Sequence, residues 1–270
     1  MNKKIISSQQ NRLVKHARLL HNKKNRTLHK QFIIEGIRAV EEYIKYDASI
    51  SYTLYSEDIE NVSGGLELLN KLKDKYEAHK VSKEIFKKIS DTENPQGILS
   101  IVGIKEYDLN EMNFEDNPLF IVLDRIQDPG NMGTIIRTAE AVGAEAIILN
   151  KGCTDPYNPK TVRATMSALL HIPIIETNDN DDWISVFKRH DIRIIGSSLD
   201  TDKSYLDIDY RGGVALIIGN EANGIDEKLF PIIDTFIKIP ITGKIESLNA
   251  SIAAAILMYK ASEYKMKNNL

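Results

Sequence analysis

The chain has 270 residues, of which 42% are hydrophobic and 27% charged, a composition typical of a soluble globular protein with one large or two modest domains. The longest apolar run, IAAAILMY at 252–259, is too short to cross a bilayer, and no signal-peptide core follows the basic start. A single cysteine, Cys153, excludes an internal disulfide and a thiolate zinc cage. We therefore expect a reduced, cytoplasmic protein without membrane association.

The formal net charge of −3 hides an uneven distribution. The first 34 residues contain nine lysines and arginines and no acidic residue, whereas the remainder carries 26 basic and 38 acidic groups. A basic arm on an acidic body suits a polyanion, because each neutralised phosphate releases counterions. The alternative is a solvated helix face with a flexible tail. The spacing of Leu13, Ala17 and Leu20 predicts a helix in the arm, with Ser7 or Ser8 as its N-cap.

Alternating short elements follow the arm. Residues 31–46 predict a strand leading into an amphipathic helix, 50–56 a strand, 65–76 and 82–90 helices, and 91–104 a turn with a strand. Together they predict a small α/β domain spanning residues 1–104. Residues 105–118 are acidic and lack periodicity, so we expect a linker there.

From residue 119 the alternation of strands and helices resumes in a second domain, residues 119–270. Apolar runs predict strands at 119–124, 145–150, 171–176, 192–199, 214–220 and 235–241. Such continuously apolar strands, separated by helical patterns, indicate a parallel sheet covered on both faces. Ligands bind such sheets beyond the carboxyl ends of the strands. Three of these ends carry unusual loops rich in Gly, Asn, Glu and Ser: DRIQDPGNMG at 124–133, GNEANG at 219–224 and IPITGKIESLN at 239–249.

Common site motifs do not explain these loops. Gly130 and Gly133 form an isolated G-x-x-G, which is weak evidence for a dinucleotide site, and neither a P-loop nor a G-x-S-x-G motif occurs. The six histidines show no metal-ligand spacing, so we expect no metal site. Glycine-rich loops at successive strand ends can wrap a ligand with main-chain groups. Each of them alone is also compatible with an ordinary tight turn.

The segments DPGNMGTIIRTA, IIGNEANGI and IPITGKIESLNASIA resemble, in order, the three motifs of the SpoU (TrmH-type) RNA ribose 2′-O-methyltransferases of the SPOUT class. The resemblance covers essentially the whole chain, and the N-terminal part looks like the substrate-binding domain of this family. It implies S-adenosylmethionine as cofactor, RNA as partner, a trefoil knot in the C-terminal domain and a homodimer whose interface completes the active site. Asp128, Ala222 and Ser167 depart from residues common in the family.

The resemblance also assigns roles by motif position. Arg137 matches the catalytic arginine, and Asn131, Glu221, Ser247 and Asn249 match the remaining polar positions, where they would orient Arg137, the loops and the ribose. Gly219, Ile239 and Leu248 would contact the adenosyl group. Alternatives are a surface ion pair for Arg137, an ordinary core role for Ile239 and Leu248, and loop capping for Asn131 and Glu221.

The expected function is therefore S-adenosylmethionine-dependent 2′-O-methylation of RNA. The large N-terminal domain is more similar to those of the ribosomal RNA enzymes than to the short extensions of the transfer RNA enzymes, which favours 23S rRNA. A transfer RNA substrate is the alternative within this class. The alternative from another functional class is a non-catalytic RNA-binding protein with a methyltransferase fold. A nicotinamide-linked oxidoreductase is the least favoured alternative.

Overall fold

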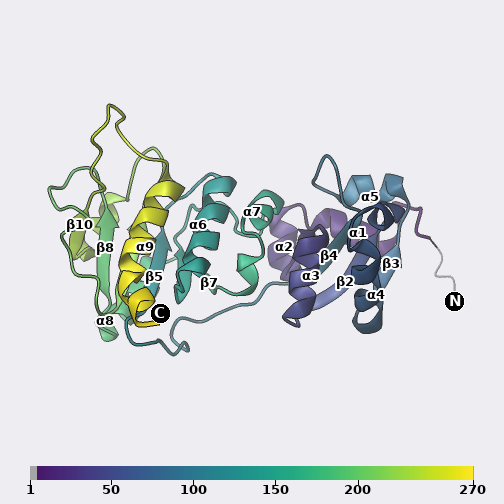
Figure 1. The fold of residues 1–270 in the computed structure, drawn as a ribbon, viewed down its shortest axis with the longest axis horizontal. Coiled ribbons are helices and arrows are strands. Elements are labelled where there is room, and N and C mark those ends of the chain that lie inside the picture. The colour runs from purple at the N-terminus through teal and green to yellow at the C-terminus, as the bar shows by residue number, and fades with distance from the viewer. Residues whose placement is uncertain (1–4, 270) are drawn as a thin grey trace. The chain divides into compact units, whose positions relative to one another are not determined.

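The computed structural model describes residues 5–269, with side chains up to residue 263. These residues form two compact units, each with its own sheet (Figure 1). Unit 1 comprises the residues up to Lys105 together with Asp155–Leu170, and unit 2 comprises Glu106–Thr154 and the residues from His171 onward. The segment 155–170 thus packs with unit 1, although the sequence pattern places it within a domain of residues 119–270.

Unit 1 has a four-stranded sheet in the order β1-β4-β2-β3, in which β4 is antiparallel to β1 and β2, and β3 is parallel to β2. Two short elements, α2 and β3, are not evident in the sequence pattern, because seven and three residues carry little periodicity. The elements of unit 1 are α1 Arg12–Leu19, α2 Lys23–His29, β1 Gln31–Glu35, α3 Ile37–Lys45, β2 Ile50–Tyr55, the 3-10 helix η1 Glu57–Asn61, α4 Gly65–Lys75, β3 Ala78–Lys80, α5 Lys83–Ile89, β4 Ile98–Gly103, α7 Pro159–Ala164 and the 3-10 helix η2 Ala168–Leu170.

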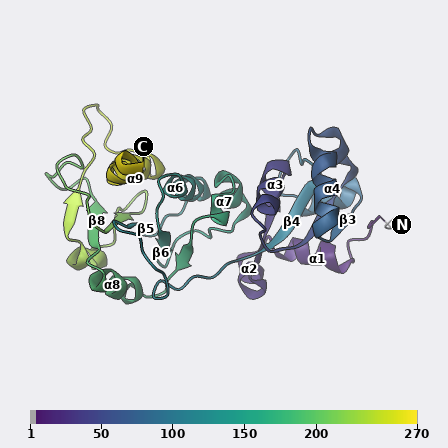
Figure 2. The same cartoon turned by 60° about the horizontal axis from the view of Figure 1, so that its bottom comes forward.

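Helices cover both faces of this sheet. On one face, α3 and α4 pack against strand residues such as Ile34, together with Tyr157 from the 155–170 segment. On the other face, α1 and α5 pack against residues such as Ile33 and Leu99. Neighbouring strand residues point to opposite faces, which is why Ile33 and Ile34 belong to different clusters. Figure 2 shows α1 and α3 on opposite sides of β4.

The basic N-terminal segment belongs to this core and is not a flexible tail over the residues described. Ala17 and Leu20, two of the three residues whose spacing predicts the helix, have no exposed surface; Leu13 is half-buried, and Val14 is the further residue with none. The expected cap is wrong, because α1 begins after Asn11, whose side-chain oxygen accepts a hydrogen bond from the backbone N–H of Leu13 at 2.9 Å. Asparagine is as good an N-cap as serine, and Ser7 and Ser8 lie one turn too early.

A buried ion pair fixes the segment 155–170 in unit 1. Arg26 is only 3% exposed, and its Nε donates to Oδ2 of Asp155 at 2.9 Å, while Nη2 makes a further short hydrogen bond to the same oxygen. Its Nη1 donates to the carbonyl of Leu20 at 2.7 Å. A buried guanidinium needs such partners, because desolvating an unpaired charge costs several kcal/mol. One of the nine basic residues of the arm is therefore withdrawn from solvent.

Unit 2 has a six-stranded sheet in the order β10-β8-β9-β5-β6-β7, and all its strand pairs are parallel. The six strands predicted from apolar runs and the parallel α/β fold class are thus confirmed. The elements of unit 2 are β5 Leu119–Leu123, α6 Pro129–Ala141, β6 Ala146–Leu149, β7 Ile174–Glu176, α8 Asn180–Arg189, β8 Arg193–Ser197, β9 Val214–Ile218, the 3-10 helix η3 Glu227–Ile232, β10 Thr235–Ile237 and α9 Ala250–Asn269.

Both faces of the second sheet are covered, as continuously buried strands require. Helix α8 and η3 pack on one face in a cluster that includes Phe120 and Phe187, and Figure 2 shows α6 and α9 on the other side. The segment expected as a linker, 105–118, contains no helix or strand in the described chain, but it is packed. Leu109 is buried, and the ring of Phe114 lies edge-on to that of Phe120 at 5.0 Å.

No helix within the described residues has the length and apolar character needed to cross a membrane.

Candidate active site

The candidate site lies where the strand order of unit 2 reverses. From β5 the chain continues to β6 and β7 on one side, and then to β8, β9 and β10 on the other. In open parallel sheets this reversal leaves a crevice at the carboxyl ends of the two strands that flank it, here β5 and β9. The loops after β5 and β9 meet at this edge, and the loop 238–249 after β10 leads into α9.

The motif loop after β5 becomes a capped helix. Asp128 is the N-cap of α6, and its Oδ1 accepts a hydrogen bond from the backbone N–H of Asn131 at 2.8 Å, while Pro129 occupies the first helical position. Proline suits this position because it has no N–H to leave unpaired. Asp and Asn cap helices about equally well, which explains why aspartate is tolerated where the family usually has asparagine.

Glu221, in the turn after β9, binds the start of this helix. Its Oε1 accepts hydrogen bonds from the side-chain amide of Asn131 at 3.0 Å and from the backbone N–H of Asp128 at 3.2 Å, and its Oε2 accepts one from the N–H of Gln127 at 3.3 Å. Partial burial acts to raise the pKa of Glu221, but the hydrogen bonds from Asn131 and the backbone outweigh it and hold that pKa below its ordinary value. The carboxylate is therefore ionised at neutral pH.

Asn131 connects this pair to the third motif. Its Oδ1 accepts a hydrogen bond from the side-chain amide of Asn249 at 3.0 Å. The Oδ1 of Asn249 in turn accepts from the backbone N–H of Ser251 at 2.9 Å, at the start of α9. A hydrogen-bonded chain Glu221–Asn131–Asn249 thus joins all three motif segments. Asn131 and Glu221 therefore hold the loops in place, as the alternative of loop capping predicts. This structural role is compatible with a further role toward the substrate.

Gly219 is buried at the end of β9, where two backbone segments approach closely. A Cβ at this position would lie 2.3 Å from both the carbonyl carbon of Gly224 and the nitrogen of Ile225, so no other residue fits. The turn formed by residues 220–224 is closed by reciprocal backbone hydrogen bonds between Asn220 and Gly224, each 2.9 Å long. Gly224 has a φ of +66°, which favours glycine.

The other predicted site residues are not held by this network. Arg137 is exposed on α6, and Ser247 is exposed in the loop after β10. Neither side chain makes a hydrogen bond or ion pair with any other residue that the structure describes. Ile239 and Leu248 are half-buried in the same loop, so they are not ordinary core residues. The surface ion pair considered for Arg137 is absent among the described residues.

Two charged residues outside the predicted site residues, Asp124 and Arg125, connect the loops at the carboxyl ends of β5 and β9. Asp124 is 3% exposed, and its Oδ2 accepts hydrogen bonds from Nε and Nη2 of Arg125 at 3.1 and 3.0 Å and from the N–H of Asp226 at 2.8 Å. Arg125 Nη2 also donates to the carbonyl of Gly224 at 3.2 Å. The pair ties the loop after β5 to the turn after β9. Its signal in the sequence is an acid–base pair directly after a wholly apolar strand.

The lone thiol has no nucleophilic role here. Cys153 donates a hydrogen bond to the carbonyl of Leu123 at 3.2 Å, and burial raises its pKa to about 11. The thiol is therefore protonated at neutral pH, and a protonated thiol is a poor nucleophile. Nearby, the side chain of Gln127 donates to the carbonyl of Gly152, which extends the network around Glu221 to the segment after β6.

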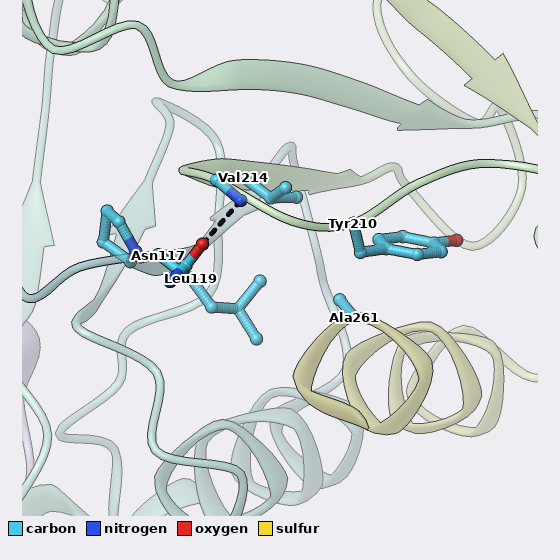
Figure 3. A pocket seen from close by; sticks show the side chains of 7 residues that line it. Asn117, Leu119, Tyr210, Val214 and Ala261 are labelled. Carbon is cyan, nitrogen blue, oxygen red and sulfur yellow. Dashed lines mark hydrogen bonds between the residues drawn. The ribbon is translucent and has the colours of Figure 1, made fainter. Parts of the chain in front are cut away.

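Neither a metal cluster nor the small pocket of unit 2 offers an alternative site. Among the described residues, no three His, Cys, Asp or Glu side chains are arranged to hold a metal ion. The pocket in Figure 3 lies at the opposite edge of the sheet, at the amino ends of β5 and β9, beside Tyr210 and Ala261. Its volume of about 10 Å³ accommodates at most a single water molecule.

Comparison with known proteins agrees with this geometry. Residues 118–259 match the model of the SpoU rRNA Methylase family, and residues 11–100 match an MRM3-like substrate binding domain. The chain is 33% identical to the 23S rRNA (guanosine(2553)-2′-O)-methyltransferase RlmP of Bacillus subtilis, over 95% of this chain and 98% of that protein. It is 27% identical to the 23S rRNA (uridine(2479)-2′-O)-methyltransferase of Streptomyces viridochromogenes, over 95% and 91% of the two chains.

Solved structures give the same result. The structure of an AdoMet-bound rRNA methyltransferase from Sinorhizobium meliloti superposes with a TM-score of 0.85, at 31% sequence identity, over 97% of this chain and 98% of that one. Both units of the chain are thus matched in sequence and in structure. The chain belongs to the SpoU rRNA methylase family.

Proposed function

We propose that the chain transfers a methyl group from S-adenosylmethionine to a ribose 2′-oxygen of RNA, and that its substrate is 23S ribosomal RNA. Family membership and the full-length similarity to 23S rRNA enzymes support this function. The observation that carries it is the chain Glu221–Asn131–Asn249, because it joins the three family motifs at the ligand-binding edge of a parallel sheet.

The described residues fit the cofactor. Bound S-adenosylmethionine supplies a methyl group activated on a sulfonium, so the protein must align the acceptor oxygen and help it lose a proton. Ile239 and Leu248 offer half-buried apolar side chains. In the described chain the backbone groups of residues 239–248 make no hydrogen bond to other protein groups, and most of this loop is exposed, so these groups are accessible to a ligand. We assign the adenosyl contacts to this loop and to Gly219.

Arg137 is proposed to bind the substrate phosphate and to stabilise the developing alkoxide. Its exposed guanidinium has no competing carboxylate among the described residues. A guanidinium has too high a pKa to act as a general base, so the proton passes to the phosphate or to a neighbouring group. Ser247 and Asn249 are assigned to the ribose, and Asn131 and Glu221 hold the loops on which this geometry depends.

A homodimer belongs to the same proposal. Helix α9 presents an apolar stripe to solvent, in which Ile252 and Tyr259 are each 51% exposed and the half-buried Ile256 lies between them. These positions lie on one face of a helix. An exposed apolar stripe of this kind is typical of an interface, and a second copy of the chain would cover it and complete the active site. Sedimentation equilibrium tests this, and a monomer at micromolar concentration contradicts it.

The trefoil knot and the cytoplasmic location stay predictions. The knot comes from the resemblance to the family alone, since the general rule is that chains do not thread loops. The location comes from the composition and the single cysteine.

The test is methyl transfer to purified RNA. The protein is incubated with methyl-labelled S-adenosylmethionine and, in separate reactions, with unmodified 23S rRNA and with transfer RNA. We expect label in 23S rRNA, recovered as a 2′-O-methylated nucleotide. Label in transfer RNA alone would assign the chain to the alternative substrate. If the folded protein binds RNA but shows no binding of S-adenosylmethionine in calorimetry, it is a non-catalytic RNA-binding protein. A nicotinamide-linked oxidoreductase would instead bind its cofactor in a fluorescence titration.

A further inference from the structure

The two helix-covered faces of the unit 1 sheet differ in how their charges are paired. On the α3 and α4 face, lysines lie beside carboxylates. Lys45 is 3.4 Å from Glu42, Lys71 is 2.9 Å from Glu67, and Lys75 forms a short ion pair with Asp47. Arg38 lacks such a partner in the described chain. This face is close to neutral, because acids and bases alternate along both helices.

The opposite face carries cations without such partners. Helix α1 contains Arg12, Lys15 and Arg18 and no acidic residue, and α5 adds Lys87 and Lys88, with one carboxylate, Glu84, in its first turn. All five side chains are exposed, and none of them forms an ion pair with a described carboxylate. Arg18 makes a single hydrogen bond to Gln9 at 3.3 Å. We call these five residues the basic ridge.

The fold explains how the ridge is assembled from two distant segments. Arg12, Lys15 and Arg18 follow one another at three-residue spacing on the solvent side of α1. The buried sides of α1 and α5 share one apolar cluster, which includes Ala17 and Phe86. Figure 1 shows the two helices next to each other, and the contacts between them agree. The core therefore brings the lysines of α5 to the same face as the arginines of α1.

Not every base in this region belongs to the ridge. Arg26 is buried in its pair with Asp155 and cannot reach a ligand in solution. Lys83 of α5 is engaged by Glu57 at 3.3 Å and Asp58 at 2.9 Å. The cations that remain are exposed and lie within 4 Å of no described carboxylate, although Lys87 interacts at longer range with Asp58 and Glu84. A polyanion or counterions would relieve the mutual repulsion that these cations retain.

We propose that the basic ridge binds the phosphodiester backbone of the RNA substrate. This rests on the proposed function for the identity of the polyanion. Lysine and arginine contacts to phosphates position a nucleic acid without reading its bases, so the ridge holds the RNA and leaves recognition of the modified nucleotide to other residues. The ridge lies on unit 1, and none of its five residues belongs to the motif loops.

The experiment compares two variants of the full-length protein with the same change in charge. The ridge variant carries Arg12→Ala, Lys15→Ala, Lys87→Ala and Lys88→Ala. The control variant carries Arg38→Ala, Lys45→Ala, Lys71→Ala and Lys75→Ala on α3 and α4. Both replace one arginine and three lysines on exposed helix positions, where alanine preserves the helix. Affinity for a transcribed 23S rRNA domain is measured from about 0.05 to 0.3 M salt, with circular dichroism and calorimetric titration of S-adenosylmethionine as checks on folding.

The ridge variant is expected to bind RNA at least about tenfold more weakly at low salt. The slope of log affinity against log salt, which is negative, should become shallower by about three. The control variant should keep the slope of the wild type within about one, and both variants should bind S-adenosylmethionine normally. Equal slopes for the two variants, with wild-type protein that still methylates the RNA, would overturn the ridge and leave the proposed function standing. Wild-type protein that neither binds nor methylates the RNA would overturn both.

Discussion

The side-chain amide of Asn131 donates a hydrogen bond to Oε1 of Glu221 at 3.0 Å, across 90 positions of the sequence. The same carboxylate accepts two backbone N–H groups from the segment that precedes α6. With the side-chain amide of Asn220 at 3.4 Å, four donors converge on one anion, and this arrangement favours the ionised form of Glu221. The loop after β5 and the turn after β9 are thereby held in one geometry before any ligand binds.

Glu221→Gln should lower methyl transfer by on the order of 10²-fold, because an amide turns a donor toward these N–H groups and displaces the loop. The pKa of Glu221 lies below its ordinary value near 4.5. Its contribution to stability is therefore present above that value and is lost as the pH falls through the lower, folded-state pKa. Urea unfolding of wild type and variant from pH 7 to pH 3 should show a difference that shrinks in this acid range.

Glu246→Gln is the matched control, because Glu246 is an exposed carboxylate in the loop after β10. It should leave the stability unchanged at every pH. A difference between wild type and Glu221→Gln that does not vary with pH would contradict the proposed role of the charge.

Gly219→Ala should destabilise unit 2 by several kcal/mol, because its Cβ would lie 2.3 Å from backbone atoms that cannot move aside cheaply. Gly243→Ala is the control, since nothing lies within 4 Å of a Cβ there. It should change stability by no more than about 0.5 kcal/mol. Urea unfolding followed by the fluorescence of Trp183, which is buried in unit 2, measures both. Equal stabilities would mean that the turn at Gly224 is looser than described.

Asp155→Ala should destabilise unit 1 by about 3–5 kcal/mol, because it leaves the buried guanidinium of Arg26 without its counter-charge. Arg163→Ala is the control, since Arg163 and Asp91 form a half-exposed pair at 2.7 Å in the same unit. Loss of that pair should cost at most about 1 kcal/mol. Thermal unfolding measured side by side tests the difference, and similar losses in the two variants would contradict it.

Ser167→Gly should stabilise the protein by up to about 1 kcal/mol. Ser167 has a φ of +74°, in the left-handed region that costs a side chain about 1–2 kcal/mol, and the family often has glycine at this position. The greater freedom of glycine in the unfolded chain offsets part of this gain. Ser185→Gly, at an exposed position inside α8, should have the opposite sign. Destabilisation by both changes would contradict the strain at Ser167.

Much of the fold follows from local sequence pattern. The six strands of unit 2 are apolar runs, and their burial on both faces requires the helices found between them. The spacing of Leu13, Ala17 and Leu20 predicts α1 and two of its buried contacts, Ala17 and Leu20, whereas Leu13 is half-buried and Val14 takes the third buried position. The motif resemblance brings Asn131, Glu221 and Asn249 to one site, and the structure places these three in one hydrogen-bonded chain.

Contacts between residues far apart in the sequence could not be predicted from the local sequence pattern. Nothing in the sequence around Arg26 indicates that it pairs with Asp155, 129 residues later, and this pairing moves the segment 155–170 into unit 1. The role of Asp124 and Arg125 likewise depends on the turn at Gly224, which only the parallel pairing of β5 and β9 brings close. Short elements such as α2 and β3 depend on tertiary packing more than on periodicity.

The most direct test of the proposed active site is the single-turnover rate of methyl transfer by Arg137→Ala with saturating 23S rRNA. Arg137 is exposed and has no partner in the described chain, so folding and S-adenosylmethionine affinity should stay those of the wild type. Methyl transfer should fall by on the order of 10² or more, and Arg137→Lys should restore little of it, because an ammonium lacks the planar fork of guanidinium. A near-normal rate for the alanine variant would contradict the catalytic role of Arg137 and this account of the site.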